Sequence, residues 1–369
     1  MPQGETFWNP YRWVTLGDQP VAHAAPGYQH CFQGLSGRLA CELEALTPLI
    51  VGDGRGEFVR RNNKPFVPAT SLKGAVRSLA ELVGNAAVPF ERGHADPDHA
   101  VVRAQTGSGA NWQLDIVART FGYLNRGDVF AGLVRFSDAE EIERAAGAGP
   151  WPSFKVSGGQ PDPDHRAFYP DRQRRKLYHH QAGAAGLTPP HAGIKEDQKR
   201  TVRPAPPGTR FAFRIDFANL REDELNLLLY CLVLEDQVTV TLSRQTLGPG
   251  AQEPLTLQGP LRHKLGGCKP QGGGSAHIRV AQMQLRTDPA SRYRGQPDPP
   301  PLCGQALQDE LQRRTQPFRA RRDATMQQLR AMLIYAPDDP RGRHVNYPTY
   351  QWFLDQKQTA DKTPLKPAT

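Results

Sequence analysis

The chain has 369 residues, of which 38% are hydrophobic and 8% aromatic, with a formal net charge of +9, 35 glycines and 34 prolines. This length allows one large domain or two medium ones, and the hydrophobic content is sufficient for a packed core. The positive charge favours a polyanionic partner, nucleic acid before an acidic membrane surface, and the Gly and Pro content indicates long loops.

The composition also disfavours secreted and membrane proteins. The five cysteines are dispersed without a C-x-x-C pair, which argues against a disulfide framework and indicates a reducing cytoplasm. No apolar run reaches membrane-spanning length, and the N-terminal MPQGETFWNPYRW lacks the apolar core of a signal peptide. We therefore expect a soluble, cytoplasmic protein without a membrane partner.

The N-terminal part combines an aromatic-rich segment with a strand, a charged loop and a helix. Residues 1–35 have no clear periodicity, and we expect them to pack across the domain. Alternating apolar residues predict a strand over 37–50, and a helix over 70–84 follows the loop GDGRGEF. Thr70 or Ser71 is the candidate N-cap of this helix.

The predicted helix has an apolar face and a basic face, and Gly84 ends it. Lys73 and Arg77 lie four residues apart on the basic face. A charged loop, a helix N-terminus and two cations on one side are suited to binding a phosphate. An ordinary amphipathic helix with a solvated basic face explains the same pattern.

Two polar insertions interrupt the periodic pattern, over about 85–115 and 147–206. The first has little periodicity. The second interleaves many Lys and Arg residues with aromatic residues, which is typical of a surface for single-stranded RNA. A disordered or loosely folded insertion explains the same composition equally well.

Outside the insertions, periodicity predicts the remaining elements. The strictly alternating TRFAFRIDF (209–217) indicates a strand, and a helix over 222–234 follows with three acidic residues in its first turn. We expect residues 286–318 to form a loop or linker. Further strands are predicted over 129–136, 237–242 and 275–285, and a further helix over 324–333.

A glycine-rich loop, RHKLGGCKPQGGG, precedes the last predicted strand. It is not a Walker loop, because no Gly-Lys-Ser/Thr occurs at the required spacing. Glycines let a backbone approach a phosphate closely and donate its N–H groups, while neighbouring cations supply charge. The candidate phosphate-binding residues of this loop are Lys264, Gly266, Gly267, Lys269, Gly272 and Gly273.

The long predicted elements follow one another in the order β-α-β-β-α-β. This order predicts an α+β fold with a ferredoxin-like (RRM-like) core and large insertions. We expect this domain to span residues 1–285, followed by a C-terminal extension over 286–355 that packs on the core and a disordered tail over 356–369.

Three segments, in this order, resemble motifs of the CRISPR-associated RAMP superfamily. They are PATSLKGAVR (68–77), Phe121-Gly122 together with RFSDA (135–139), and the glycine-rich loop, in which Cys268 and Gln271 depart from the usual family pattern. FWNPYRWV near the N-terminus also resembles the opening of one RAMP subgroup. The resemblance implies an RRM-like fold in which glycine-rich loops, helix termini and insertions, rather than sheet aromatics, hold an extended guide RNA.

The same resemblance implies a function in antiviral defence. The chain is expected to be a guide (CRISPR) RNA-binding backbone subunit of a type III-like effector complex, with guide RNA, complementary target RNA and other effector subunits as partners. A β-hairpin thumb from one of the two insertions is expected to displace a nucleotide at regular intervals in the guide–target duplex. The residues expected to hold guide phosphates are Ser71, Lys73, Arg77, Lys264, Gly266, Gly267, Lys269, Gly272 and Gly273.

Some members of this superfamily cleave target RNA through an aspartate in the loop after the first strand. With a divalent metal such as Mg²⁺, the 2′-OH attacks its adjacent phosphate while the metal offsets the developing charge. The only aspartate in the corresponding loop here is Asp53, with Arg55 and Glu57 nearby, so the resemblance makes Asp53 the candidate catalytic residue. A turn residue favoured by the GDG context explains the same aspartate without catalysis.

Two other functions are consistent with the sequence. A related RAMP branch processes guide precursors as a metal-independent endoribonuclease, which needs a general acid or base such as a histidine near a tyrosine and a lysine. Lys176, Tyr178, His179 and His180 in RKLYHHQ are the clustered candidates, although neutral packed histidines explain this cluster as well. The other function is that of a purely architectural RAMP subunit, which cleaves nothing.

Overall fold

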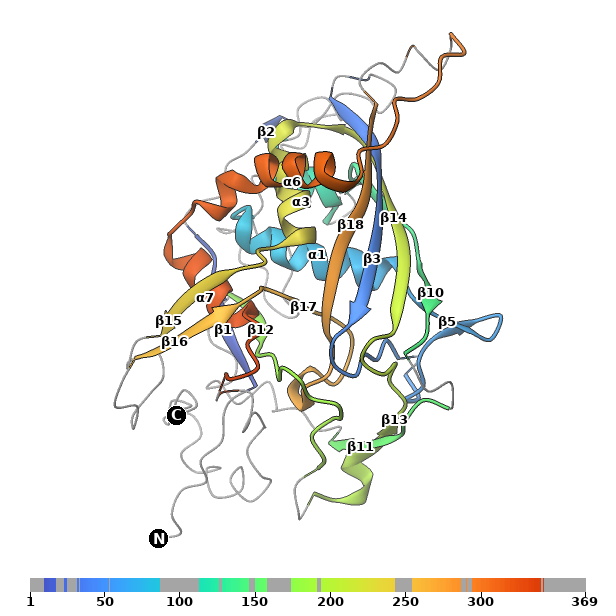
Figure 1. Cartoon of the computed structure of the whole chain (residues 1–369), viewed down its shortest axis with the longest axis vertical. Helices are drawn as coiled ribbons and strands as arrows, with labels where there is room; N and C mark the ends of the chain where they lie inside the picture. Colours follow the sequence, from blue (N-terminus) through green and yellow to red (C-terminus); the bar gives the residue numbers. More distant parts are fainter. Residues whose placement is uncertain are drawn as a thin grey trace.

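One antiparallel sheet lies at the centre of the protein, and its three long strands are β3 (Leu35–Ala45), β14 (Arg210–Leu220) and β18 (Ser275–Arg286) (Figure 1). The shorter strands of this sheet are β4 (Arg60–Arg61), β5 (Lys64–Val67), β9 (Val134–Phe136), β10 (Ala139–Glu143) and β17 (His263–Lys264). The strand order is β17-β18-β3-β14-β10-β5-β4, and β9 also pairs with β14.

This structure is a computed structural model. It describes residues 10–17, 23–24, 32, 34–52, 54–86, 113–125, 128–145, 150–157, 174–190, 194–242, 254–286, 290, 294–339 and 341. Most of the predicted first insertion, the end of the predicted C-terminal extension (residues 342–355) and the predicted tail lie outside these residues.

Two helices cover the apolar face of the sheet. The alternating apolar side chains of TRFAFRIDF on β14 are at most 5% exposed. α1 (Ala69–Val83) and α3 (Glu222–Val233) lie on the same side of the sheet and complete one continuous apolar core (Figure 1). Removal of these apolar faces from water supplies the main favourable term in folding.

Each of these helices lies, along the chain, between two strands that are not neighbours in the sheet. α1 lies between β3 and β10 in the chain, and β14 separates these two strands in the sheet. α3 lies between β14 and β18 in the chain, and β3 separates them in the sheet. The prediction of an α+β fold is confirmed in its coarser part, because the protein combines helices with an antiparallel sheet.

The predicted strand over 37–50 is too long at its C-terminal end, because β3 ends at Ala45. The N–H groups of Leu46 and Thr47 both donate to the Ser275 carbonyl, at 2.8 and 3.3 Å, so the chain leaves the ladder there. Pro48 follows, and proline has no N–H to donate to a neighbouring strand.

The predicted strand over 129–136 is wrong, because two separate strands occupy this stretch. β8 (Asp128–Phe130) pairs with β7 (Tyr123–Asn125), whereas β9 pairs with β14. Gly132 lies between β8 and β9 with a φ of 75°, and a Cβ at this position would lie 2.5 Å from the Gly122 nitrogen. The chain therefore changes partner at a position that only glycine fits.

The predicted loop over 286–318 is wrong for its second half, where α6 (Gly304–Arg319) packs against α3. Leu307 and Leu311, one turn apart, are buried, and Arg314 pairs with Glu222 of α3. Arginine and glutamine have high helix propensities, so the composition that suggested a linker is also that of an amphipathic helix. The predicted helix over 324–333 is confirmed as α7 (Ala324–Leu333).

Several two-stranded ribbons extend from this core. The predicted strand over 237–242 is confirmed as β15 (Val238–Leu242), which pairs with β16 (Leu255–Gly259). Parts of the second insertion are ordered: β11 (Phe154–Ser157) pairs with β13 (Lys199–Val202), and β12 (Arg174–Tyr178) pairs with the N-terminal β1 (Tyr11–Thr15). The described part of this insertion therefore has regular structure rather than a loose fold.

The remaining short elements are β2 (His23–Ala24), β6 (Gln113–Leu114), α2 (Ile116–Phe121), η3 (Glu196–Gln198) and η4 (Lys269–Gln271).

None of the helices in the described ranges is long and apolar enough to cross a membrane.

Candidate nucleic-acid interface

Three loops meet at one end of the central sheet, where β3 ends and β18 begins, at the lower end of the sheet in Figure 1. The glycine-rich loop contacts the segment after β3, because Gly267 N–H donates to the Ile50 carbonyl at 2.7 Å and Gly274 N–H to the Pro48 carbonyl at 2.9 Å. It also contacts the second insertion, where Thr188 N–H donates to the Gln271 carbonyl at 3.0 Å. A small second core joins the three loops and consists of Ile50, Val156, Leu187, Val202 and Cys268.

The glycines of this loop allow it to pack closely on its neighbours. Gly266 has a φ of 77°, and a Cβ there would lie 2.3 Å from the Ile50 carbonyl oxygen. Gly272 has a φ of 91°, and a Cβ there would lie 2.3 Å from a side-chain oxygen of Gln181 in the insertion. A larger residue would require the backbone to move at Gly266. At Gly272 it would be strained by the positive φ and would displace the Gln181 side chain.

Three of the four predicted phosphate-binding glycines have N–H groups with acceptors within the protein. Gly267, Gly272 and Gly273 donate to the carbonyls of Ile50, Lys269 and Cys268, at 2.7, 3.2 and 2.9 Å. In this conformation the loop therefore offers an anion its positive charge more than its backbone donors.

Lys264 lies at the centre of this charge. Its Nζ donates to the Gly272 carbonyl at 3.3 Å and to Ser275 Oγ at 3.1 Å, so the lysine ties the loop to the first residue of β18. Burial, with the positive charge of Lys269, lowers the pKa of Lys264 to about 7. The described residues include no carboxylate that pairs with either lysine.

Lys269 and Lys176 lie on either side of this centre, on the glycine-rich loop and on β12. Both contact the ring of Tyr178, with Nζ atoms 5.8 and 5.3 Å from its centroid, and Lys176 Nζ is 3.7 Å from the centroid of Tyr11. Burial lowers the pKa of Lys269, and burial with the charge of Lys269 lowers the pKa of Lys176 to about 8. Three ammonium groups from three elements thus concentrate positive charge at this end of the sheet.

The two histidines of RKLYHHQ are buried beside the lysines. His180 Nδ1 is 2.8 Å from Ser275 Oγ, and its Nε2 is 3.1 Å from the Arg262 carbonyl. Burial lowers the pKa of both His179 and His180 well below the usual value, with a further contribution from the charge of Lys264. Both are therefore neutral near pH 7, as the packed-histidine interpretation of the sequence expects.

The basic face of α1 differs, because its arginine already pairs with a carboxylate. Lys73 Nζ donates to the Val134 carbonyl at 3.2 Å. Arg77 donates to Glu81 at 3.0 Å and to the Gly122 carbonyl at 2.9 Å, and Glu81 also accepts from Arg175 of β12 at 2.8 Å. In the described ranges no hydrogen bond or ion pair joins Lys73 or Arg77 to the glycine-rich loop.

The predicted N-caps Thr70 and Ser71 are wrong, because both lie inside α1, which begins at Ala69 after Pro68. Ser71 is partly buried, and its N–H donates to the Pro68 carbonyl at 2.9 Å. The cap comes from a distant residue of RFSDA instead. Asp138 accepts from the Ala69 N–H at 2.8 Å, so a carboxylate already lies at this helix N-terminus.

Asp53 lies outside the described residues, but contacts of its neighbours in the loop are known. Gly52 pairs with Phe58 in an isolated bridge, and Glu57 pairs with Arg203 of the insertion at 2.8 Å. This loop starts immediately after Ile50, whose carbonyl accepts from the glycine-rich loop. Within the part of the chain that the structure describes, no group of three or more His, Cys, Asp or Glu residues is placed to hold a metal ion.

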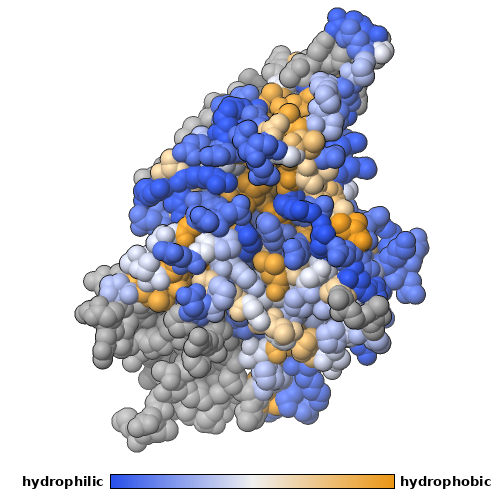
Figure 2. All heavy atoms as spheres, viewed as in Figure 1, coloured by the Kyte–Doolittle hydropathy of each residue, from blue (hydrophilic) through white to orange (hydrophobic). Residues whose placement is uncertain are grey.

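The open face of the sheet is not a stacking platform. Its outward side chains form ion pairs, with Arg38 and Asp216 at 2.7 Å and Arg279 and Glu42 at 2.7 Å, and Arg210 also pairs with Glu42. Figure 2 shows mostly hydrophilic residues on one side of the molecule, with hydrophobic ones in small groups between them. The ion pairs occupy outward positions of β3, β14 and β18.

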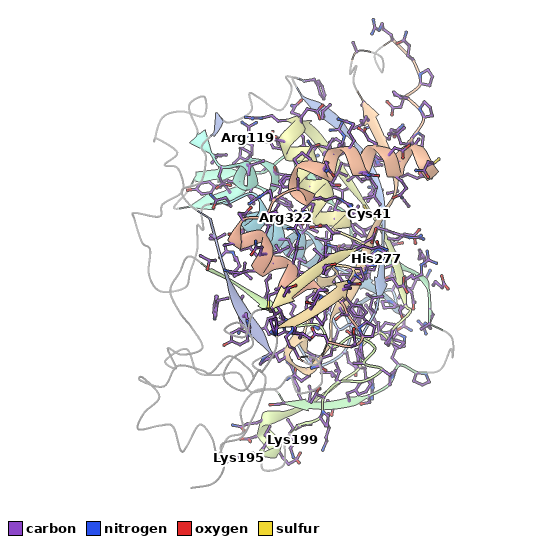
Figure 3. All side chains as sticks on the ribbon, turned by 60° about the vertical axis from the view of Figure 1, so that its left-hand side comes forward. Cys41, Arg119, Lys195, Lys199, His277 and Arg322 are labelled. Carbon is purple, nitrogen blue, oxygen red and sulfur yellow. The ribbon has the colours of Figure 1, made fainter. Side chains whose placement is uncertain are left out.

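Several basic residues of the second insertion are also paired. Lys155 and Lys199 both contact Glu196, at 3.5 and 2.7 Å, and Figure 3 shows Lys199 and Lys195 together at the lower end of the molecule, far from Arg119. Part of the basic composition that indicated an RNA surface therefore stabilises the insertion itself.

Sequence reasoning did not connect the RKLYHHQ cluster or Tyr11 with the glycine-rich loop. RKLYHHQ already has the residue types of a functional site, but nothing in the spacing along the chain indicates which loop it contacts. The contact arises from the pairing of β12 with β1 and from the packing of the insertion on the loop.

A sequence model of the RAMP superfamily matches residues 42–237, which is more than half of the chain. The match begins within β3 and ends after α3, so it includes α1, the Asp53 loop and the second insertion, whereas the glycine-rich loop lies beyond its C-terminal end. A comparison with curated proteins found no match.

Proposed function

Because the chain belongs to the RAMP superfamily, we propose that it is a guide RNA-binding backbone subunit of a type III-like CRISPR effector complex. The family supports a CRISPR-associated, RNA-binding role. One observation favours RNA binding in this chain: Lys264 and Lys269 lie together at the end of the sheet, and neither has a carboxylate partner among the described residues. Such uncompensated charge favours a polyanion.

We assign the core to the ferredoxin-like (RRM-like) type. The strand order is β18-β3-β14-β10, and each of the two helices connects strands that are separated by one strand in the sheet. Both features support the assignment. In this arrangement the guide follows the end of the sheet rather than its face. The ion pairs on the open face are consistent with this path.

The guide phosphates first contact Lys264 and Lys269. Lys73 has two remaining N–H donors beside its bond to Val134 and provides a second, weaker contact near Ser71. Arg77 acts mainly through Glu81 and Gly122, so it positions α1 rather than the RNA. The partners are guide RNA, complementary target RNA and other effector subunits. The ribbon of β11 and β13, beside the Asp53 loop, is the candidate thumb.

Target cleavage through Asp53 is a further part of this proposal. Mg²⁺ binds one or two carboxylates and completes its coordination with water and phosphate oxygens. The loop contains two carboxylates, and Glu57 is paired with Arg203. Asp53 and RNA phosphates would therefore hold the ion, which would offset charge at the reacting phosphate.

Guide-precursor processing is the alternative that one observation favours. His179 and His180 lie beside Lys264 and the glycine-rich loop, which is where RNA would bind. Histidine chemistry does not need a divalent ion. Dependence on Mg²⁺ therefore separates the two reactions, and a purely architectural subunit shows neither.

The first experiment is to express the tagged protein with its genomic neighbours and to sequence the RNA that copurifies. Short RNAs with a uniform 5′ sequence from a repeat array are the expected result. Heterogeneous RNA, or none, would contradict the proposed role.

The purified complex then tests Asp53→Ala on complementary target RNA, with Mg²⁺ and with EDTA. We expect this variant to retain guide RNA and to lose all metal-dependent cleavage. Cleavage by the variant would exclude Asp53 as the catalytic residue.

A further inference from the structure

The segment that connects β18 to α6 contains a run of prolines that the proposed function does not use. Residues 296–301 have the sequence QPDPPP, and each of them either is a proline or precedes one. A proline ring fixes φ at about −65°, and the residue before a proline is restricted to extended conformations. The sequence therefore favours the polyproline II conformation for the whole run, which needs no hydrogen bonds within it.

Contacts with β18 hold this run in place. Arg286 Nε donates to the Asp298 carboxylate at 3.0 Å, and Gln284 Nε2 donates to the Pro299 carbonyl at 2.9 Å. Directly after the run, Leu302 forms an antiparallel backbone bridge with β18, with N–H···O distances of 2.7 and 3.1 Å. The run is thus fixed beside the end of β18, at the upper end of the sheet in Figure 1, and a partner would have little to order on binding.

The proline rings of this run are exposed, namely those of Pro297, Pro299, Pro300 and Pro301. Polyproline II has three residues per turn, so Pro297 and Pro300 lie on the same side. Within the described part of the chain, no hydrogen bond reaches the carbonyls of Pro297, Pro300 or Pro301. The run therefore presents apolar rings and unused acceptors together.

These features suit a protein partner better than a nucleic acid. The one charged residue within the run is Asp298, an anion, so the run itself offers no cation to a phosphate. Aromatic side chains pack against proline rings, and Trp N–H and Tyr O–H groups donate to exposed carbonyls. Aromatic-lined grooves recognise P-x-x-P segments in this way.

Protection of the sheet edge explains part of the same pattern. Prolines beside the end of β18 prevent the addition of a further strand. Such protection does not require that the rings of four prolines in six residues face solvent, because a charge or a single proline is sufficient. The exposed rings therefore point to a second role.

We propose that residues 296–301 form a docking ridge for a different protein, one that has an aromatic-lined groove for a P-x-x-P segment. Pro297 and Pro300 enter the groove, and the unused carbonyls accept from its Trp or Tyr donors. Because the fold already holds the docking ridge extended, little conformational entropy is lost on binding. This inference does not depend on RNA binding.

The first test measures whether the docking ridge can enter such a groove. An isotope-labelled SH3 domain that binds P-x-x-P peptides is titrated with the purified full chain, and the NMR signals of its groove residues are followed. We expect saturable binding that Pro297→Ala together with Pro300→Ala weakens about tenfold or more, because both rings on one side of the ridge are lost.

Pro152→Ala together with Pro254→Ala is the matched control, because both prolines are exposed and lie outside the docking ridge. This control should bind the SH3 domain as tightly as the unmodified chain does, and thermal unfolding should show that both double variants are folded. Absence of SH3 binding, or equal binding by the ridge variant, would overturn the proposal.

The second test identifies the partner. The photocrosslinker p-benzoylphenylalanine replaces the exposed Gln296, and the full chain is expressed with its genomic neighbours. We expect a crosslink to an aromatic-lined groove on a different protein, and we expect it to disappear when Pro297→Ala and Pro300→Ala are added.

A crosslink only to RNA or only to a second copy of this chain would overturn the proposal, as would the absence of any crosslinked protein. Aggregation of the ridge variant without loss of a partner would show that the prolines only protect the edge of β18, and would overturn it too. The RNA that copurifies should be the same for all variants, so failure of the docking ridge is distinguishable from failure of the proposed function.

Discussion

The basic face of α1 and the glycine-rich loop both contain cations predicted to bind phosphate, but these cations have different surroundings. The cations are Lys73 and Arg77 on α1, and Lys264 and Lys269 at the loop. On α1, Arg77 pairs with Glu81 and Asp138 caps the helix N-terminus, whereas Lys73, like Lys264, donates to a carbonyl and has a lowered pKa. At the loop, Lys264 and Lys269 have no carboxylate partner in the described ranges, and their pKa values are lowered. The first arrangement stabilises the fold, and the second leaves charge available to a ligand.

This difference shows that the carboxylate partners of a cation indicate whether it is available to bind a phosphate. A cation that already pairs with a carboxylate gains less from a phosphate than a cation without such a partner. On this basis the loop contributes more to RNA affinity, and α1 contributes more to stability. Three measurements of decreasing expected effect test this distinction.

The largest expected effect is the loss of folding stability in the variant Glu81→Ala. Glu81 is 8% exposed and joins Arg77 of α1 to Arg175 of β12, so its removal leaves two largely buried guanidinium groups without their carboxylate. We expect the free energy of unfolding in urea to fall by about 2–4 kcal/mol. RNA affinity of the folded protein should change little.

Glu196→Ala is the control for this measurement, because Glu196 also contacts two lysines but on the surface. Its removal should cost much less stability than removal of Glu81, because exposed ion pairs contribute little. Similar losses of stability for both variants would show that the ion pairs of Glu81 with Arg77 and Arg175 have no special structural role.

The second effect concerns the salt dependence of RNA binding. Each phosphate contact on a single strand contributes about 0.7 to the slope of log affinity against log salt. We expect Lys269→Ala to lower the slope by about 0.7, Lys73→Ala by less, and the double variant by about one unit in total. Binding titrations over a range of salt concentrations give these slopes.

A larger change for Lys73→Ala than for Lys269→Ala would reverse the comparison between the two regions. Unchanged slopes for both variants would place the guide path elsewhere on the molecule. Arg313→Ala on α6 serves as the control for a charge removed outside the proposed path, because Arg313 is exposed and pairs with Glu310.

The smallest effect is expected at the N-terminus of α1. Asp138→Ala removes the acceptor of the Ala69 N–H and the partner of Arg61, which should lower stability by about 1 kcal/mol. Asp138→Asn retains a side-chain oxygen for the cap and should lose less, as thermal unfolding can show. Tighter RNA binding by Asp138→Ala would instead identify this helix end as a phosphate site that the carboxylate occupies.

The sequence alone determined the elements whose signal is local. The alternation of TRFAFRIDF, the acidic first turn after it and the apolar spacing from Leu72 to Val83 each predicted an element that the structure contains. The motif around Lys73 also identified the family that the RAMP match supports. These signals are reliable because side-chain periodicity follows directly from backbone geometry.

Tertiary structure alone decided which side chains meet. It placed Asp138 at the N-terminus of α1, paired Arg77 with Glu81, and brought Lys176 and Tyr178 of the insertion to Lys269. It also placed α6 against α3, where the composition had suggested a linker. Periodicity specifies which face of an element is apolar, but the partner of a charge depends on contacts between residues far apart in the chain, which local patterns do not encode.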